Sequence, residues 1–331
     1  MTRYEHGGNV WTIARTYGYV PKDIIDLSTC VAHSAPNALK EVLTQDWLLG
    51  VLPEPYSPLF STNYRKKNNL EANFDVLLTA GTTEVIYAIS RMFAGKNVSI
   101  IPPTYMDYER AAGLAGMNIN FDNYDNVKLA FICNPNNPTG ELISQEVIVK
   151  LVGKYPDTLF VIDESYMPFV FDGWTSVCMA RNVITLRSYS KVFGIPGLRI
   201  GYVVADMAII EGIKAQISTW SVSTIAQQAA LKLLESDEIP TDKLDATERM
   251  RFVELLRALG LAPAPSATHF NLCQVLDGVD AKYLVGTAAK KGVLLRDCSN
   301  IRGLESGSFV RVSMRKGWQQ ALERVAGCIR C

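Results

Sequence analysis

The sequence predicts an α/β protein with a mostly parallel central sheet covered by helices, followed by a smaller α/β domain. The chain has 331 residues, of which 48% are hydrophobic, so it can bury a large core. From Asp75 onward, short apolar segments alternate with helical patterns, which is typical of parallel strands buried on both faces. After Trp220 the pattern changes to long helices and then a second set of strands. We therefore expect a large domain at 41–236 and a small domain formed by 1–40, with an N-terminal arm, and 237–331.

The hydrophobic period predicts the elements of both regions. In the first region we expect strands at 76–79, 98–101, 129–133, 159–162, 183–186 and 200–205, and helices at 82–93, 105–115 and 143–153. In the second we expect helices at 223–236, 241–259, 280–291 and 317–328, and strands near 269–275, 293–296 and 308–313. The arm has a helical pattern at 10–17 and an apolar patch at 24–27. The proline-rich residues 49–64 are expected to be mostly an ordered loop.

The composition argues against several classes of function and partner. Thirty-three basic residues balance thirty-three acidic ones, so no global field attracts nucleic acid or anionic membrane. No apolar run approaches the ~20 residues of a membrane span, and the first residues lack a signal-peptide core. We expect a cytoplasmic protein that acts on a small molecule.

The cysteines indicate reduced thiols. Their number is seven, and they are scattered through expected strands and helices. Cys328 and Cys331 form a C-x-x-C pair at the end of the chain, but without a second pair or a nearby histidine a metal site lacks ligands. We expect no metal, and we interpret the pair as frayed terminal thiols.

The stretch from 185 to 202 carries the chemistry. An apolar strand leads into a serine-rich turn, Lys191, two glycines, a proline and Arg199. A lysine held in irregular backbone at the end of a strand can form a Schiff base with an aldehyde, and Ser188 and Arg199 can hold a phosphate. The alternative is an ordinary surface lysine after a strand, because short motifs match by accident.

Three other strand ends carry groups that suit pyridoxal phosphate. Gly81, Thr82 and Thr83 form a glycine turn and a helix start, where backbone amides can cradle a phosphate, although a simple N-cap explains Thr82 equally well. Asp163 can pair with a pyridinium nitrogen and keep it protonated, or it can cap a helix. Asn137, in the turn-rich segment 133–140, can donate to a phenolate oxygen.

These residues resemble, in order and spacing, the signature set of the fold-type-I pyridoxal phosphate enzymes. The resemblance rests on 134–140, on Asp163-x-x-Tyr166, and on Ser188-x-x-Lys191 with Arg199. It implies a homologous fold, with Lys191 as the Schiff-base residue and the 137–138 peptide often cis. It also implies Asp163 on the ring nitrogen, Tyr166 and Asn137 on the ring oxygen, Tyr105 stacked on the ring, and Gly81, Thr82, Thr83, Ser188 and Arg199 around the cofactor phosphate.

Within that superfamily the chain looks most similar to threonine-phosphate decarboxylases of cobalamin biosynthesis, and next to histidinol-phosphate aminotransferases. Segments 6–9, 220–222, 295–300 and 309–312 carry this likeness. It implies Arg311 for a substrate carboxylate, His6 and Arg296 for a substrate phosphate, and a homodimer in which Tyr56 reaches the neighbouring active site. A structural ion pair for Arg311 and a disordered terminal His6 are the alternatives.

Two segments depart from the relatives. Residues 27–33 replace an asparagine-rich segment, and 54–58 replace an Arg-Tyr-Pro-Asp sequence. Both line the substrate side, so the substrate is less certain than the cofactor. We expect decarboxylation of a small phosphorylated amino acid such as threonine or serine phosphate. Transamination of the histidinol phosphate type is the alternative, and a non-catalytic cofactor-binding module is the third.

Overall fold

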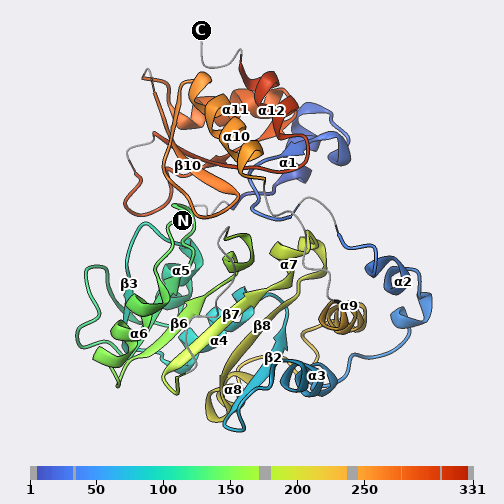
Figure 1. Ribbon diagram of the computed structural model, residues 1–331, viewed down its shortest axis with the longest axis vertical. Coiled ribbons are helices and arrows are strands. Elements are labelled where there is room, and N and C mark those ends of the chain that lie inside the picture. Colours follow the sequence, from blue (N-terminus) through green and yellow to red (C-terminus); the bar gives the residue numbers. More distant parts are fainter. Residues whose placement is uncertain are drawn as a thin grey trace.

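The computed structural model describes residues 6–32, 35–170, 180–236, 245–276, 278–305 and 308–326. Figure 1 shows a large sheet with its helices in the lower half of the molecule and a smaller sheet, containing β10, with helices in the upper half. The expected α/β class and mostly parallel central sheet are confirmed. The boundary expected at 236/237 adjoins residues outside the described ranges, so the domain limits stay a prediction.

The large sheet has seven strands in the order β2-β8-β7-β6-β5-β3-β4. All six strands expected in this region are present, and β4 was missed because its three residues are mostly polar. The strands are β2 (Phe74–Thr79), β3 (Asn97–Ile100), β4 (Asn118–Asn120), β5 (Leu129–Cys133), β6 (Leu159–Asp163), β7 (Val183–Ser188) and β8 (Gly201–Asp206). Strand β8 is antiparallel to both β2 and β7, and the other pairs are parallel.

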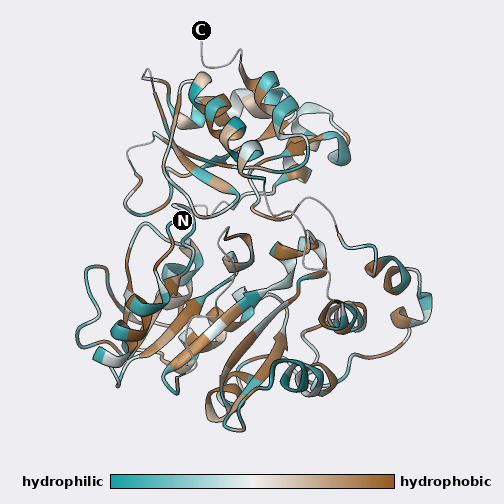
Figure 2. Cartoon of the chain, in the orientation of Figure 1, coloured by the Kyte–Doolittle hydropathy of each residue, from teal (hydrophilic) through white to brown (hydrophobic). Residues whose placement is uncertain are grey.

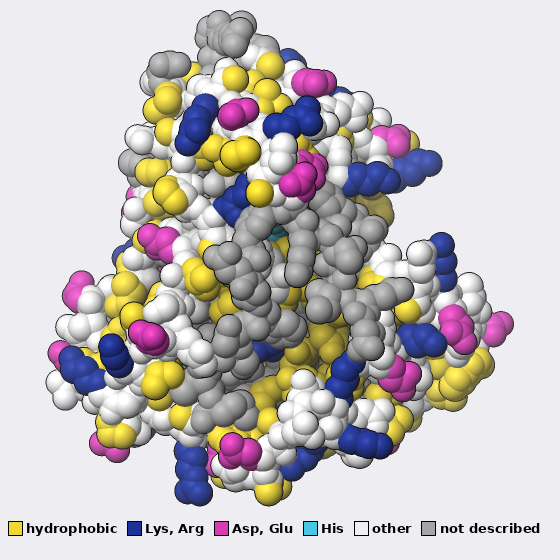
Figure 3. Space-filling view, in the orientation of Figure 1, with side chains coloured by type: hydrophobic (Ala, Val, Ile, Leu, Met, Phe, Trp, Pro, Cys, Tyr) yellow, Lys and Arg dark blue, Asp and Glu magenta, His cyan; other side chains and the backbone are white. Residues whose placement is uncertain are grey.

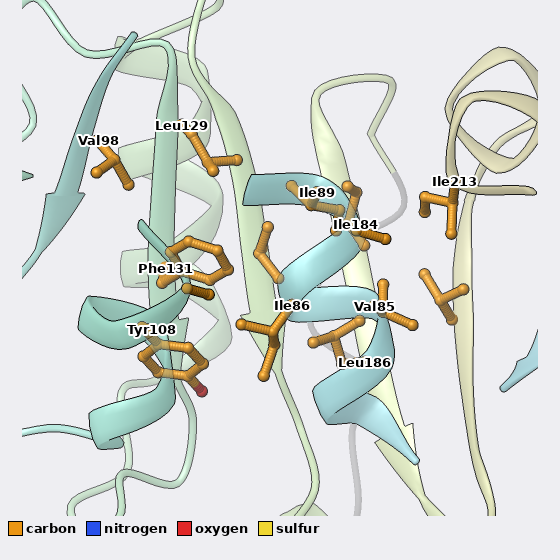
Figure 4. Close-up of a cluster of buried hydrophobic side chains, with 14 of the residues drawn as sticks. Val85, Ile86, Ile89, Val98, Tyr108, Leu129, Phe131, Ile184, Leu186 and Ile213 are labelled. Atoms are coloured by element: carbon orange, nitrogen blue, oxygen red, sulfur yellow. The ribbon is translucent and has the colours of Figure 1, made fainter. Parts of the chain in front are cut away.

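Helices cover both faces of this sheet. One face carries α4 (Thr82–Met92), α5 (Met106–Leu114) and α8 (Met207–Lys214), and the other carries α3 (Pro58–Asn68), α6 (Gln145–Lys154) and α9 (Thr224–Glu235). Successive residues of β5 alternate between them: Phe131 packs with α4 and α5, whereas Ile132 packs with α6. Figure 4 shows the first of these clusters, and Figure 2 shows that the strands are mostly hydrophobic while the helices have mixed surfaces.

The smaller sheet is antiparallel, in the order β12-β13-β10-β9. Val310 and Val312 of β13 pack against the helices, so the intervening Arg311 points to the opposite face of the sheet. The elements of this part are α10 (Ala246–Ala258), β9 (Leu261–Pro263), β10 (Phe270–Val275), α11 (Ala281–Lys290), β12 (Arg296–Asp297), β13 (Phe309–Ser313) and α12 (Trp318–Val325).

The N-terminal arm joins this smaller part. Its helix α1 (Val10–Tyr17) has the expected bounds, and β1 (Ile25–Asp26) pairs in parallel with β11 (Val293–Leu294). The single strand expected at 293–296 is therefore two short strands, β11 and β12, which belong to different sheets.

The loop expected at 49–64 is partly wrong, because helix α3 begins at Pro58. A proline at the first helical position costs no hydrogen bond, since the first amides of a helix have no partner within it. Helices α2 (Leu39–Leu43) and α8 were also missed. The remaining short elements are α7 (Tyr189–Val192) and the 3₁₀ turns η1 (Pro21–Asp23), η2 (Asp46–Leu49), η3 (Met167–Phe169) and η4 (Pro196–Leu198).

The surface agrees with the balanced composition. Figure 3 shows acidic and basic side chains interspersed over the visible face. Within the described ranges, no helix combines the length and apolar character needed to cross a membrane. Cys30, Cys133, Cys273 and Cys298 are free and buried, whereas the terminal pair Cys328 and Cys331 lies outside the described residues.

Candidate active site

Three adjacent parallel strands bring the predicted chemical groups to one edge of the large sheet. Strand β5 leads to Asn137, β6 ends at Asp163, and β7 leads to Lys191. Because the carboxyl ends of parallel strands meet at the same edge, residues far apart in the sequence become neighbours there. The peptide between Asn137 and Pro138 is cis, as the resemblance implied.

A pocket at this edge joins the large sheet, the smaller sheet and the arm. Seven predicted residues line it: His6, Tyr105, Asn137, Tyr166, Lys191, Arg296 and Arg311. Seven further lining residues were not predicted: Gly7, Ser28, Thr29, Cys30, Thr104, Met106 and Ile301. Ser28, Thr29 and Cys30 belong to the departing segment 27–33, whose place on the substrate side was anticipated. His33 of that segment lies outside the described residues.

Lys191 lies in a one-turn helix, so the irregular backbone predicted for it is wrong. Tyr189 and Val192, three residues apart, both pack into the core beneath α7, which favours a helical turn. The Lys191 ammonium lies 5.9 Å from the centre of the Tyr166 ring. Burial lowers the pKa of Lys191, and although the Cys30 thiol opposes this, the charges of Arg311 and Arg199 lower it further.

Asp163 is buried and accepts hydrogen bonds on both carboxylate oxygens. Ser165 donates to Oδ1 through its backbone N (3.0 Å) and its Oγ (2.5 Å), and the Tyr108 hydroxyl donates to Oδ2 at 2.9 Å. Burial raises the pKa of Asp163, and these hydrogen bonds act in the opposite direction. Neither Tyr108 nor Ser165 was predicted, although both lie within three residues of predicted positions.

The expected phosphate cradle lies where α4 begins. Arg199 packs so closely on Gly81 that a Cβ there would lie 2.6 Å from Nη2, and a Cβ on Gly201 would lie 2.6 Å from the backbone N of Thr82. Arg199 has φ of 54°, a left-handed conformation that is uncommon outside glycine. Ser188 is the register partner of Gly201, so it adjoins the same turn. Thr83 is the second residue of α4.

Two arginines face the pocket from the smaller sheet. Arg296 of β12 and Arg311 of β13 are direct cross-strand partners, and both are buried. Arg311 donates to the backbone O of Ser28 at 2.6 Å and to Asn137 Oδ1. Arg296 donates to Asn300 Oδ1 at 2.8 Å and contacts the Met106 sulfur at 3.2 Å. Like charges placed directly opposite one another destabilise a sheet unless anionic or polar groups compensate them.

The arm closes one side of the pocket through a tightly bonded turn. The Ser28 hydroxyl donates to Asp26 Oδ1 at 2.6 Å and accepts from the backbone N of Gly8 at 2.7 Å. Arg315 donates to the Thr29 hydroxyl at 2.7 Å and to the backbone O of Asp26 at 3.0 Å. This turn fixes His6 and Cys30 in the wall of the pocket.

Tyr56 does not line the pocket of its own chain. Its hydroxyl accepts from Thr219 Oγ1 at 3.2 Å, and its backbone N donates to the Thr219 carbonyl at 3.1 Å. Its expected reach into a neighbouring subunit stays a prediction.

The chain is similar to known proteins over most of its length. Residues 29–329 match the family model "Aminotransferase class I and II". The histidinol-phosphate aminotransferase of Methanococcus aeolicus is 28% identical, over 94% of this chain and 91% of that protein. A chloroplastic histidinol-phosphate aminotransferase of Arabidopsis thaliana is 32% identical, over 90% of this chain and 76% of that protein.

Two solved structures have the same fold. The L-threonine-O-3-phosphate decarboxylase of Porphyromonas gingivalis superposes with a TM-score of 0.81 and 29% identity, over 92% of this chain and 98% of that one. The histidinol-phosphate aminotransferase of Clostridium acetobutylicum gives the same TM-score and coverage at 25% identity. Both kinds of relative named in the sequence analysis are therefore found. The relatives reported above by sequence similarity are histidinol-phosphate aminotransferases.

Proposed function

Since the chain belongs to the class I and II aminotransferase family and is a pyridoxal phosphate enzyme, we propose that it transfers the amino group of a phosphorylated amine of the histidinol phosphate type. The observation that carries the proposal is the buried cross-strand pair Arg296 and Arg311, which faces the same pocket as Lys191. Two guanidinium groups can receive anionic groups, namely the phosphate of the amine substrate in one half-reaction and a carboxylate of 2-oxoglutarate or glutamate in the other.

The residues present fit pyridoxal phosphate. Gly81 and Gly201 leave room for backbone amides and the Arg199 guanidinium to surround a phosphate at the start of α4. Asp163, fixed by Ser165 and Tyr108, would hold the proton on the ring nitrogen. When bound, the cofactor supplies an aldehyde that captures amines and a protonated ring that accepts electrons.

Lys191 would do two things in this site. Its amine would attach the cofactor and, once displaced by the substrate amine, would move the proton at the substrate α-carbon. Because burial lowers the pKa of Lys191, a larger fraction of the amine is neutral and able to accept that proton. Tyr105 would stack on the ring, and Asn137 and Tyr166 would donate to its oxygen.

The substrate side would bind anions. Arg311 makes its hydrogen bonds to two neutral oxygens, so a carboxylate of 2-oxoglutarate or glutamate would supply a countercharge for this buried guanidinium. Arg296 and His6 line the same pocket and would bind the substrate phosphate. Small phosphorylated molecules are therefore the preferred ligands.

Decarboxylation of threonine or serine phosphate is the second candidate. The cross-strand arginine pair favours it, because a carboxylate and a phosphate of one small molecule could occupy the pair together. If Arg311 held that carboxylate perpendicular to the ring, carbon dioxide would leave in place of the α-proton. The Porphyromonas gingivalis structure, named a threonine-phosphate decarboxylase, gives this candidate further support.

We also propose a cytoplasmic homodimer in which Tyr56 completes the partner's site. Exposed apolar side chains precede Tyr56 in the chain: Trp47, Leu49 and Leu52 are 58%, 77% and 78% exposed. An exposed apolar patch of this kind marks an interaction surface. Sedimentation equilibrium would give a dimer mass, and a monomer with full activity would refute this part of the proposal.

The proposed activity is tested by steady-state kinetics. The enzyme loaded with pyridoxal phosphate is given L-histidinol phosphate and 2-oxoglutarate, and glutamate is measured. We expect turnover with a kcat/KM that falls by at least about 100-fold when the phosphate is removed, since charge-assisted hydrogen bonds to two cationic side chains are lost. Equal values for L-histidinol phosphate and L-histidinol would contradict the assigned substrate class.

A further inference from the structure

Asp107 is a buried carboxylate at the edge of the pocket whose role the proposed chemistry leaves open. It lies in the first turn of α5, and its side chain is 6% exposed. Its Oδ1 lies 3.4 Å from His6 Nε2, and its Oδ2 accepts a hydrogen bond from the Tyr105 hydroxyl at 2.8 Å. The two carboxylate oxygens therefore contact two neighbouring residues of the pocket, His6 and Tyr105, whose ring centres lie 5.8 Å apart.

Burial of a carboxylate is costly unless hydrogen bonds and opposite charge compensate it. Although burial opposes ionisation, the hydrogen bond and charge of His6, with smaller contributions from Tyr105 and Arg110, bring the pKa of Asp107 below its ordinary value. Asp107 is therefore an anion, and its Oδ1 lies against the imidazole of His6 on the arm.

The two residues that precede Asp107 in the chain also contact the site. Tyr105, Met106 and Asp107 are consecutive, and each touches a different part of the site. Tyr105 lines the pocket, the Met106 sulfur contacts Arg296, and Asp107 contacts His6. With Nε2 directed at Asp107, Nδ1 is the ring nitrogen of His6 left to face a phosphate oxygen, and it donates a hydrogen bond when the imidazole is protonated.

We propose that Asp107 is the positioning residue that orients His6, and with it the N-terminal arm, toward the substrate phosphate. This inference rests on the proposed phosphate role of His6. It assigns Asp107 no contact with the reacting atoms: Asp107 acts through His6, so its effect must vanish when His6 is absent. A residue that only supports Tyr105 would behave differently, because its effect would persist without His6.

The experiment is a double-mutant cycle on the enzyme loaded with pyridoxal phosphate. The variants are Asp107→Asn, His6→Ala and the double variant. Glu109→Gln is the matched control, because Glu109 lies one half-turn on in α5 and pairs instead with Arg302 at 2.6 Å. For each, kcat and KM are measured with L-histidinol phosphate and L-histidinol, and the dissociation constant of inorganic phosphate is measured by calorimetry.

We expect Asp107→Asn to raise the KM for L-histidinol phosphate and the dissociation constant of phosphate roughly 10-fold, the loss typical of one hydrogen bond to a charged group. The kcat and the kinetics with L-histidinol should change less than about 2-fold. The double variant should be no worse than His6→Ala, since the two residues act as a unit. Glu109→Gln should match the parent enzyme.

Additive effects of Asp107→Asn and His6→Ala, or an equal loss with L-histidinol, would overturn the inference. A strong effect of His6→Ala with none of Asp107→Asn would also overturn it while leaving the proposed function intact. If L-histidinol phosphate were not turned over at all, the proposed function would fail, and the phosphate titrations alone would still decide the role of Asp107.

Discussion

The proposed cofactor half and the proposed substrate half of the site are built in different ways. In the cofactor half, Asn137, Asp163 and Lys191 each lie at or within four residues of the end of a strand in one continuous sheet. In the substrate half, His6 comes from the arm, and Arg296 and Arg311 come from a second sheet. The residues of the cofactor half follow strands of a single sheet. The residues of the substrate half come together only because the arm and the second sheet meet at the pocket.

The contacts that join the halves are both apolar and polar: Cys30 of the arm, Tyr166, and Phe270 of β10 pack in one buried cluster. Arg311 reaches Asn137 and the Ser28 carbonyl, and the backbone N of Ala267 donates to the Gly140 carbonyl at 2.8 Å. Changes in the cofactor half should therefore alter cofactor binding and kcat together. Changes in the substrate half should alter KM and leave the cofactor in place.

The largest expected effect is that of Lys191→Ala. Removal of the amine that attaches the cofactor and moves the α-proton should lower kcat by roughly 10³-fold or more. The visible absorbance of the attached cofactor should also be lost. Lys232→Ala is the control, because Lys232 pairs with Glu41 on the surface. A Lys191→Ala enzyme that kept its turnover would contradict the assignment of Lys191 as the residue that attaches the cofactor.

Asp163→Asn should have the next largest effect. Loss of the carboxylate that holds the ring proton should lower kcat on the order of 100-fold and weaken cofactor binding. Tyr108→Phe removes only one of the hydrogen bonds to Asp163, so its effect on kcat should be about 5-fold to 10-fold. Steady-state kinetics and cofactor titration compare the two variants. A loss of kcat in Tyr108→Phe as large as that in Asp163→Asn would contradict the expected order of effects.

In the substrate half, Arg296→Ala should raise the KM for a phosphorylated substrate by about 10-fold to 100-fold, because a charge-assisted contact to phosphate is lost. The KM for the unphosphorylated analogue and the cofactor absorbance should change little. Arg302→Ala is the control, because Arg302 pairs with Glu109 and is about half exposed. Equal changes in KM for the two substrates would count against a phosphate role of Arg296.

The smallest expected effect is a shift in pH dependence. Cofactor attachment to the apoenzyme needs a neutral Lys191, so its rate should rise with pH through the pKa of that amine. Since burial and the nearby arginines lower this pKa, the midpoint should lie below the ~10.4 of a free lysine. Arg311→Gln removes one of those charges, so the midpoint should move to higher pH. A shift to lower pH would contradict the arrangement of charges.

The two halves also differ in how far the sequence could predict them. Lys191, Asp163 and Asn137 were found because each lies next to an apolar strand, and local pattern is what a sequence reports directly. Tyr108 and Ser165 were missed because a phenol in a helix and a serine after a strand carry no signal until the structure places them against Asp163.

The substrate half could be proposed only by resemblance. No local pattern reports that Arg296 and Arg311 are cross-strand partners, or that a turn at 26–29 ties the arm to Arg315. The helix at 58–68 was missed for a related reason. Its sequence begins with a proline and is largely polar, and helix α3 is held in place by the burial of Phe60 against the large sheet.

We propose that the pocket combines a cofactor lysine with a binding site for a phosphorylated amine, and that the enzyme transfers the amino group of that amine. The most direct test is to add L-histidinol phosphate, and separately L-threonine phosphate, to the enzyme loaded with pyridoxal phosphate, while the visible spectrum and carbon dioxide release are recorded together. We expect L-histidinol phosphate to convert the yellow enzyme to its colourless amine form with no carbon dioxide released. A spectrum that stays yellow with L-histidinol phosphate, with carbon dioxide released from L-threonine phosphate, would contradict amino transfer and establish decarboxylation in its place.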